Sequence, residues 1–137
     1  MTTIQDLLDR NDIADLAASI GRAIDGGRFD DLREVYTPDV VTTTPGGQAA
    51  GIDATVALAK RNHEIHDRTQ HLVGDVRIDL DGDRAAVATN TLAVFVPRGE
   101  DDPVAARGVR YRFDAVRTDA GWRFSTVTID AVWKRSI

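Results

Sequence analysis

The sequence predicts an α+β domain in which N-terminal helices pack against one face of a strongly curved, mostly antiparallel sheet. In the first third of the chain, apolar residues recur at the spacing of one helical face, as at Ile13, Leu16, Ile20 and Ile24. From about residue 70 onward the period changes to two, which is typical of strands with one buried face. Helices followed by consecutive strands with short turns are the pattern of this fold class.

The first predicted element is a helix over residues 4–25, either one long helix or a helix with a weak point at Asn11-Asp12. Gly26-Gly27 follows it directly, and glycine readily adopts the left-handed conformation that ends many helices. Asp25 therefore lies in the last helical turn, where a carboxylate opposes the negative end of the helix dipole and typically costs about 0.3–1 kcal/mol. Such a violation of a local preference indicates either a solvated helix end or a position where a carboxylate has a function.

A short helix and a first strand are predicted next. Residues 29–36 have the spacing of a short amphipathic helix, whose first turn Asp31 and Glu34 are expected to cap. The segment 39–44 is β-branched and predicts a strand. Pro45-Gly46-Gly47 ends this strand and begins a loop.

The rest of the chain predicts one more helix and then a meander of strands. Asp53 is the expected N-cap of the helix, which frays through the polar residues 62–70. Strands are predicted at 72–80, 86–96, 109–117 and 122–133, joined by turns at Asp81-Gly82 and Asp119-Ala120-Gly121 and by a polar loop at 97–107.

Length and composition limit the classes of function. The 137 residues are expected to form one domain, 1–137, because this length supports a single hydrophobic core. A formal net charge of −5 without a run of Lys or Arg argues against nucleic acid as a partner. No stretch of about 18 apolar residues predicts a membrane span or membrane partner. The N-terminus has no secretory signal and the chain has no cysteine, so a cytoplasmic location is expected.

Three parts of the sequence together resemble the SnoaL-like branch of the nuclear-transport-factor-2-like (NTF2-like) superfamily. They are the run 19–32 with Tyr36 and Asp39-Val40-Val41, the run 69–74, and Gly121-Trp122-Arg123-Phe124 before the last strand. The resemblance covers nearly the whole chain and implies a cone-shaped barrel, formed by a bent sheet wrapped around the helices. It also implies a deep pocket at one end of the cone and a homodimer.

Members of this superfamily use different catalytic groups in the same cone. The set that resembles ketosteroid isomerase is missing here. Thr44 stands where those enzymes have an aspartate base ahead of a proline, and a threonine cannot accept a carbon-bound proton. Ile20 stands where they have an oxyanion-binding tyrosine.

The set of the dehydratase-like members matches at two positions. Proteins similar to scytalone dehydratase and the bile-acid 7α-dehydratase use an aspartate at the end of the first helix and a histidine at the sheet edge. Asp25 and His71 match both. Ile20 and Ile24 depart from the pattern, because those enzymes have tyrosines near the aspartate, and Val96 stands in place of the second histidine of scytalone dehydratase.

An Asp–His pair supplies general acid–base chemistry. The unperturbed imidazole pKa of about 6.5 puts both protonation states within reach at neutral pH, and a carboxylate bonded to one ring nitrogen fixes the tautomer. We therefore expect His71 to be the catalytic acid and base and Asp25 to orient it. The predicted substrate-binding residues are Ile20, Asn90, Tyr111 and Trp133, and Thr91 is a further candidate helper.

No metal and no other cofactor is predicted. His63 and His66 lie about one helical turn apart, but Glu64 between them does not complete the His-Glu-x-x-His zinc motif. A solvated helix end is the expectation for both histidines. Asp81-Gly82-Asp83 offers too few ligands for a calcium-binding loop.

Three functions remain open. The first is a cofactor-independent acid–base enzyme acting on a small hydrophobic carbonyl or hydroxylated ring compound, with dehydration ahead of isomerisation or cyclisation. The second is a non-catalytic module that holds a small apolar ligand or a partner chain in the same cone, and isoleucine at positions 20 and 24 favours it. The third, an accessory β-subunit of a ring-hydroxylating oxygenase, shares the fold, but no residue of this sequence points to it.

Overall fold

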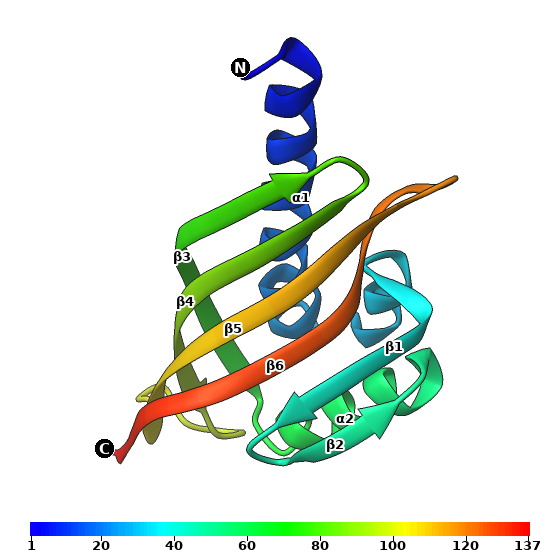
Figure 1. Cartoon of the computed structure of the whole chain (residues 1–137). Coiled ribbons are helices and arrows are strands. Elements are labelled where there is room, and N and C mark those ends of the chain that lie inside the picture. Colours follow the sequence, from blue (N-terminus) through cyan, green and yellow to red (C-terminus); the bar gives the residue numbers. More distant parts are fainter.

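The computed structural model describes all 137 residues and places the helices on one side of a six-stranded sheet (Figure 1). In chain order the elements are α1 (Ile4–Asp25), the 3-10 helix η1 (Phe29–Glu34), β1 (Tyr36–Thr44), β2 (Gly47–Ala50), α2 (Ile52–His63), β3 (Arg68–Asp81), β4 (Arg84–Val96), β5 (Ala105–Thr118) and β6 (Gly121–Ser136). The predicted α+β fold class is confirmed. None of the helices combines the length and apolarity that a membrane crossing requires.

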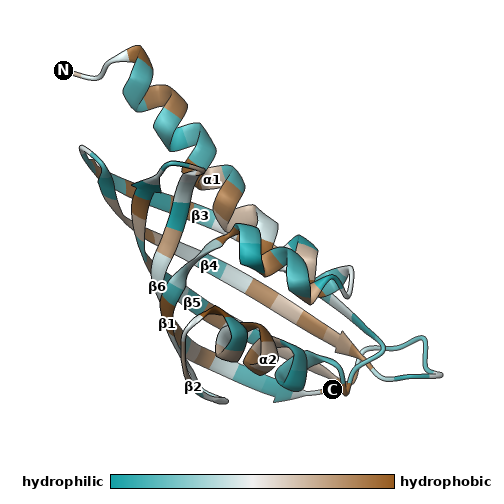
Figure 2. Cartoon of the chain, turned by 90° about the vertical axis from the view of Figure 1, so that its right-hand side faces the viewer, coloured by the Kyte–Doolittle hydropathy of each residue, from teal (hydrophilic) through white to brown (hydrophobic).

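The sheet has the strand order β2-β1-β6-β5-β4-β3. All neighbouring strands run antiparallel except β1 and β6, which are parallel, so the sheet is mixed and mostly antiparallel as predicted. It bends around α1 and α2, which lie on the same side of it (Figure 2). Because β2 and β3 are its two edges, the cone is open along one side rather than a closed barrel.

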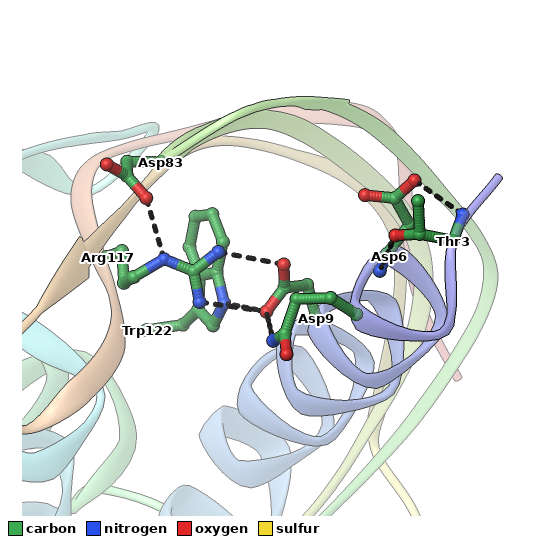
Figure 3. Close-up of polar contacts among 7 residues, drawn as sticks. Thr3, Asp6, Asp9, Asp83, Arg117 and Trp122 are labelled. Atoms are coloured by element: carbon green, nitrogen blue, oxygen red, sulfur yellow. Dashed lines mark hydrogen bonds and ion pairs between the residues drawn. The ribbon is translucent and has the colours of Figure 1, made fainter. Parts of the chain in front are cut away.

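α1 is one unbroken helix, which is the first of the two alternatives predicted for this segment. It begins at a capping box in which the backbone N–H of Asp6 donates to the Thr3 hydroxyl and the N–H of Thr3 donates to the Asp6 carboxylate, at 3.1 and 2.9 Å (Figure 3). It ends at Asp25, and Gly27, two residues later, has a φ of 68°, the left-handed conformation that the glycine pair predicted. The N–H of Arg28 then donates to the carbonyl of Ala23 at 2.8 Å, which completes a Schellman motif.

A buried carboxylate joins the N-terminal half of α1 to the sheet. The side chain of Asp9 is only 3% exposed and accepts two hydrogen bonds from the Arg117 guanidinium, at 2.9 and 2.8 Å, and one from the Trp122 indole at 3.1 Å (Figure 3). Arg117 also pairs with Asp83 at 2.8 Å. The guanidinium bonds hold the pKa of Asp9 well below its usual range, so this carboxylate stays ionised while buried.

The hydrophobic core lies between α1 and the inner face of the sheet. Ile13 and Ile20 of α1 belong to the same buried cluster as Phe113 of β5 and Phe124 of β6, whose rings stack with centroids 4.1 Å apart. Burial of such side chains stabilises the fold by about 25 cal/mol per Å² of apolar surface. This packing fixes the direction of the α1 axis relative to the sheet. It therefore also fixes where the C-terminal end of α1 meets the sheet.

The segment after α1 corrects three sequence predictions. Asp31 does not cap the short helix, because the helix begins after Arg28 and the Asp31 carboxylate accepts a hydrogen bond from the Arg28 guanidinium at 3.0 Å. The first strand begins at Tyr36, three residues earlier than predicted. The expected loop after it is wrong, since residues 47–50 pair with β1 as an antiparallel strand.

α2 begins two residues earlier than predicted. Its N-cap is Gly51, with φ of 90°, and Asp53 lies inside the first turn and pairs with Arg33 at 2.6 Å. A positive φ at this position favours glycine over a side-chain cap. Ile65 lies beyond the end of this helix and is 74% exposed.

β3 contains a β-bulge opposite β4. Gly74 pairs with Asn90 and Arg77 pairs with Ala88, so β3 has one residue more than β4 between these two pairs. Asp75 in the bulge has a φ of 50°, a left-handed conformation that aspartate adopts more readily than most residues.

The bulge changes which side chains of β3 face inward. Before it, odd-numbered residues such as His71 are the less exposed ones, and after it the even-numbered Ile78 and Leu80 are. The sequence predicts one uninterrupted alternation from Leu72 to Leu80, and the first half of this prediction is wrong. Leu72 is 69% exposed because the extra residue reverses the faces of the strand.

Candidate active site

A pocket of about 430 Å³ lies between the C-terminal end of α1, α2 and the inner face of the sheet. Its size falls in the range of about 300–1,000 Å³ that is typical of small-molecule sites. Most of its wall is apolar, with Ile20, Ile24, Leu58 and Phe95 among the lining residues. Polar groups occur at a few places only, so their positions determine the chemistry of the pocket.

Asp25 and His71 meet at this pocket, 46 residues apart in sequence. The Nδ1 atom of His71 lies 2.6 Å from Oδ1 of Asp25, and the backbone N–H of His71 donates to Oδ2 at 2.8 Å. The Thr69 hydroxyl donates to Oδ1 at 2.9 Å. The carboxylate thus accepts three hydrogen bonds from one strand, which fixes its orientation. Its side chain is 26% exposed, whereas the His71 side chain is 4% exposed.

Three local features bring the two residues together. The Schellman motif ends α1 directly after Asp25, so the carboxylate projects from the helix end. Gly21 lies one turn earlier and allows α1 to approach β3 closely, because a Cβ at this position would lie 3.1 Å from the His71 Cβ. The β-bulge sets the face of β3 on which His71 lies.

The hydrogen-bond pattern assigns the tautomer of His71. An ionised carboxylate can only accept, so Nδ1 carries the proton that lies between the two side chains. Nε2 of the neutral ring is then an unprotonated acceptor, and it makes no hydrogen bond within the protein. Since His71 lines the pocket, this nitrogen is available to a ligand there.

A second imidazole faces the first, and the sequence prediction missed it. His63, expected at a solvated helix end, lines the pocket with its ring centroid 5.5 Å from that of His71. Its Nδ1–H donates to the carbonyl of Ala59 at 2.8 Å. Burial lowers the pKa of His63, and the nearby charges of His71, His66 and Arg107 lower it further. The sequence held one signal for this placement. The apolar residues of the helix up to Leu58 indicate that one face of it is buried, and His63 lies near that face.

Two tyrosine hydroxyls also belong to the pocket. Tyr36 at the start of β1 and Tyr111 in the middle of β5 are 6% and 7% exposed, and both line the cavity. Burial raises the pKa of Tyr111 to about 12 and raises the pKa of Tyr36 as well, and no hydrogen bond contributes to either shift. Both side chains therefore stay protonated at neutral pH and can donate a hydrogen bond to a ligand.

The structure separates the four predicted substrate-binding residues. Ile20 and Tyr111 line the pocket, at the expected place. Asn90 is on the outer face of β4, where it donates to Asp75 at 2.7 Å, and Trp133 is 45% exposed on the outer face with its indole over Gly108. The placement of Asn90 and Trp133 in the pocket is therefore wrong.

The reason is the register of the sheet. Asn90 lies between two buried threonines of β4, so its own side chain must point away from the core. One of these neighbours, Thr91, is 5% exposed and lies beneath the pocket floor close to His71, where its hydroxyl has no hydrogen-bond partner. No group of three or more His, Asp or Glu side chains is placed to hold a metal ion.

Comparisons with known proteins show the family and the fold of the chain. The chain is 31% identical over 130 residues to the uncharacterised protein Rv2910c of Mycobacterium tuberculosis, a match that covers 90% of this chain and 85% of the relative. The structure of the present chain superposes on a candidate scytalone dehydratase of Novosphingobium aromaticivorans with a TM-score of 0.88 at 18% identity. The superposition covers 99% of this chain and 92% of the other.

A second solved structure is similar to the same extent. It is the hexachlorocyclohexane dehydrochlorinase LinA-type3 of Novosphingobium barchaimii, with a TM-score of 0.84 at 17% identity, covering 96% of this chain and 91% of the other. At these identities the structural likeness shows the fold alone. The model of the SnoaL-like domain family matches residues 5–128. The chain therefore belongs to the SnoaL-like family and has the NTF2-like fold.

Proposed function

We propose that the protein is a cofactor-independent general acid–base enzyme that dehydrates a small hydrophobic carbonyl compound, with isomerisation or cyclisation as the next candidate reactions. One observation carries the proposal. The Nδ1 atom of His71 is bound to Asp25 at 2.6 Å, while Nε2 makes no hydrogen bond within the protein and His71 lines an apolar pocket. A base that is oriented by a carboxylate and open to a ligand is the arrangement that proton abstraction requires.

The proposed reaction uses this nitrogen twice. Nε2 of His71 first takes a proton from the carbon next to the substrate carbonyl, and the electron pair of that C–H bond moves into the enolate. The imidazolium is stabilised by Asp25 at its other nitrogen. It then returns the proton to the β-hydroxyl, whose C–O bond breaks, so that water and a carbon–carbon double bond form.

The enolate oxygen needs hydrogen-bond donors, and the pocket offers two. Tyr36 and Tyr111 keep their protons at neutral pH and line the same cavity. We assign them the role that tyrosines near the aspartate have in the dehydratases, since Ile20 and Ile24 occupy those positions here. Removing one such donor typically costs about 10²–10³ in kcat.

The fold relatives support an elimination. The two solved structures described above are named as a scytalone dehydratase and a dehydrochlorinase. Both names denote enzymes that catalyse an elimination, of water and of hydrogen chloride respectively. A non-catalytic binding module is the second candidate function. The observation that favours it is the apolar wall formed by Ile20 and Ile24 beside the Asp–His pair.

The test is turnover of β-hydroxy carbonyl ring compounds, followed by the ultraviolet absorbance of the conjugated product. Replacing His71 by Ala is expected to lower turnover of any substrate found by about 10²–10⁴-fold, because positioned proton transfer by such a group contributes that much and His63, the other imidazole of the pocket, has no carboxylate partner. Asp25→Asn should lose a large part of the rate, since the imidazolium would lose its counter-charge.

Asn90→Ala is the matched control, because this polar side chain lies on the outer face. It should retain the rate of the unmodified protein. Calorimetric binding of the substrate to His71→Ala separates the two functions. A variant that still binds but does not turn over supports the enzyme, whereas equal rates in His71→Ala and the unmodified protein contradict it.

A further inference from the structure

We propose that the mouth of the pocket binds an anionic group of the ligand, a carboxylate or a phosphate, through Arg107, Lys134 and Arg61. These three residues come from β5, β6 and α2, and all three line the pocket. The inference rests on the proposed function for one point only, namely that the reactive end of the ligand lies at His71. It narrows the substrate class to apolar ring compounds that carry a negative charge at the opposite end.

The register of the sheet places the cations relative to the dyad. His71 pairs with Ala93, Ala93 pairs with Arg107, and Arg107 pairs with Lys134, so these four residues form one row across β3, β4, β5 and β6. All four line the pocket and therefore share the inner face of the sheet. With strands about 4.8 Å apart, the Cα atoms of His71 and Arg107 are separated by about 10 Å, which is the length of one or two fused rings.

Ala93 keeps the space between the two ends open. It is the residue between the imidazole and Arg107 in this row, and its side chain is a single methyl group. A larger side chain at this position would fill the inner face between them. A flat ring can therefore lie over Ala93, with one end at His71 and the other at the cations.

The two cations of the row lie directly opposite each other without an acidic partner. Like charges at paired positions of an antiparallel sheet destabilise it. Arg107, Lys134 and Arg61 take part in none of the salt bridges of the protein, although acidic residues outnumber basic ones by 22 to 17. An anion between the side chains would remove the repulsion and would supply the missing counter-charge.

The Arg107 residue is exposed to solvent, but its guanidinium lies over an aromatic ring of the pocket wall. Its central carbon lies 4.9 Å from the centre of the Phe95 ring, a cation–π contact with a residue of the pocket wall. Burial lowers the pKa of His63, which lines the pocket, and of the nearby His66, and the charge of Arg107 lowers both further. The positive field of Arg107 therefore acts inside the cavity.

Binding of three matched probes tests this inference without any need for turnover. They are 2-naphthoate, 2-naphthyl phosphate and the neutral 2-naphthamide, measured by calorimetry at low salt, because screening weakens such contacts. The unmodified protein should bind at least one anionic probe about 10-fold more tightly than the amide. A larger gain in affinity for 2-naphthyl phosphate would indicate a phosphorylated ligand. A larger gain in affinity for 2-naphthoate would indicate a carboxylic acid.

The double variant Arg107→Gln with Lys134→Gln should bind the anionic probes and the amide equally, while binding of the amide changes little. Arg135→Gln is the matched control, because Arg135 neighbours Lys134 but does not line the pocket. It should keep the preference for anions. His71→Ala should keep it too, so that a failure of the proposed catalysis leaves this test valid.

Three outcomes would overturn the inference. They are equal binding of the anions and the amide by the unmodified protein, a preference for anions that survives in the double variant, and no binding of any probe. Circular dichroism of each variant shows whether it is folded. If the double variant does not fold, the single variants Arg107→Gln and Lys134→Gln provide the same comparison.

Discussion

His63 and His71 face each other across the pocket with different environments. His71 bonds to the carboxylate of Asp25, whereas His63 donates its Nδ1–H to the carbonyl of Ala59. Burial lowers the pKa of His63, so its ring is neutral at pH 7 and its Nε2 atom can only accept a hydrogen bond. His63 therefore offers a ligand in the pocket a hydrogen-bond acceptor beside the one on His71.

The lowered pKa of His63 makes folding stability depend on pH. The unfolded chain binds a proton at this residue near pH 6.5, and the folded protein does so only at lower pH. Since the unfolded state binds more protons in this window, stability falls as the pH drops below about 6.5. His63→Asn should lose less stability than the unmodified protein between about pH 7 and pH 5. Urea unfolding at both pH values measures this, and an equal loss in both proteins would contradict it.

The bulge in β3 determines the side of the sheet on which His71 lies. Up to Gly74 the odd-numbered side chains face α1, and beyond Arg77 the even-numbered ones do. Without the extra residue, a strand that buried Ile78 and Leu80 would place His71 on the outer face. The position of His71 at the pocket therefore depends on the left-handed backbone at Asp75.

Substitutions at Asp75 test this dependence. A β-branched residue fits poorly at a φ of 50°, so Asp75→Val should destabilise the protein by about 1–3 kcal/mol and reduce turnover. Asp75→Gly loses the same hydrogen bond from Asn90 but keeps access to this conformation, and should leave both properties closer to normal. Chemical denaturation and the turnover assay measure the two effects. Similar losses in the two variants would show that the side chain, and not the backbone, matters.

At the scale of the whole molecule, two carboxylates of α1 attach the helix to opposite parts of the sheet. Asp9 binds Arg117 and Trp122 at the β5–β6 turn, and Asp25 binds His71 on β3. The chain between them lies over the core, so both attachments limit sliding of α1 along the sheet (Figure 1). The position of Asp25 at the pocket thus depends on contacts made 16 residues earlier.

Asp9 should also contribute to stability against acid. Its folded pKa is depressed, so its contribution is fully present above the unfolded pKa of about 3.9 and is lost as the pH falls toward the lower folded value. Asp9→Asn should lower stability at neutral pH by about 1–3 kcal/mol, because the buried hydrogen bonds lose their charge. Thermal unfolding at pH 7 and at about pH 3 is the measurement. A variant as stable as the unmodified protein at pH 7 would contradict this role.

The sequence by itself determined the features that depend on neighbouring residues. The apolar period and the glycine pair fixed α1 and its end, which placed Asp25, and the alternating segments fixed four of the strands within a few residues. The resemblance then paired Asp25 with His71, and the 2.6 Å contact between them agrees with that pairing.

Only the tertiary structure decided which face each side chain takes. A bulge of one residue reverses a strand, so Leu72 faces outward and His71 inward, and no local pattern marks where the extra residue falls. Pairing between distant strands placed Asn90 and Trp133 outside and aligned Arg107 with Lys134 at the mouth. Packing of α2 turned His63 into the cavity. These outcomes depend on contacts between residues far apart in the chain, whereas periodicity reports only on neighbours.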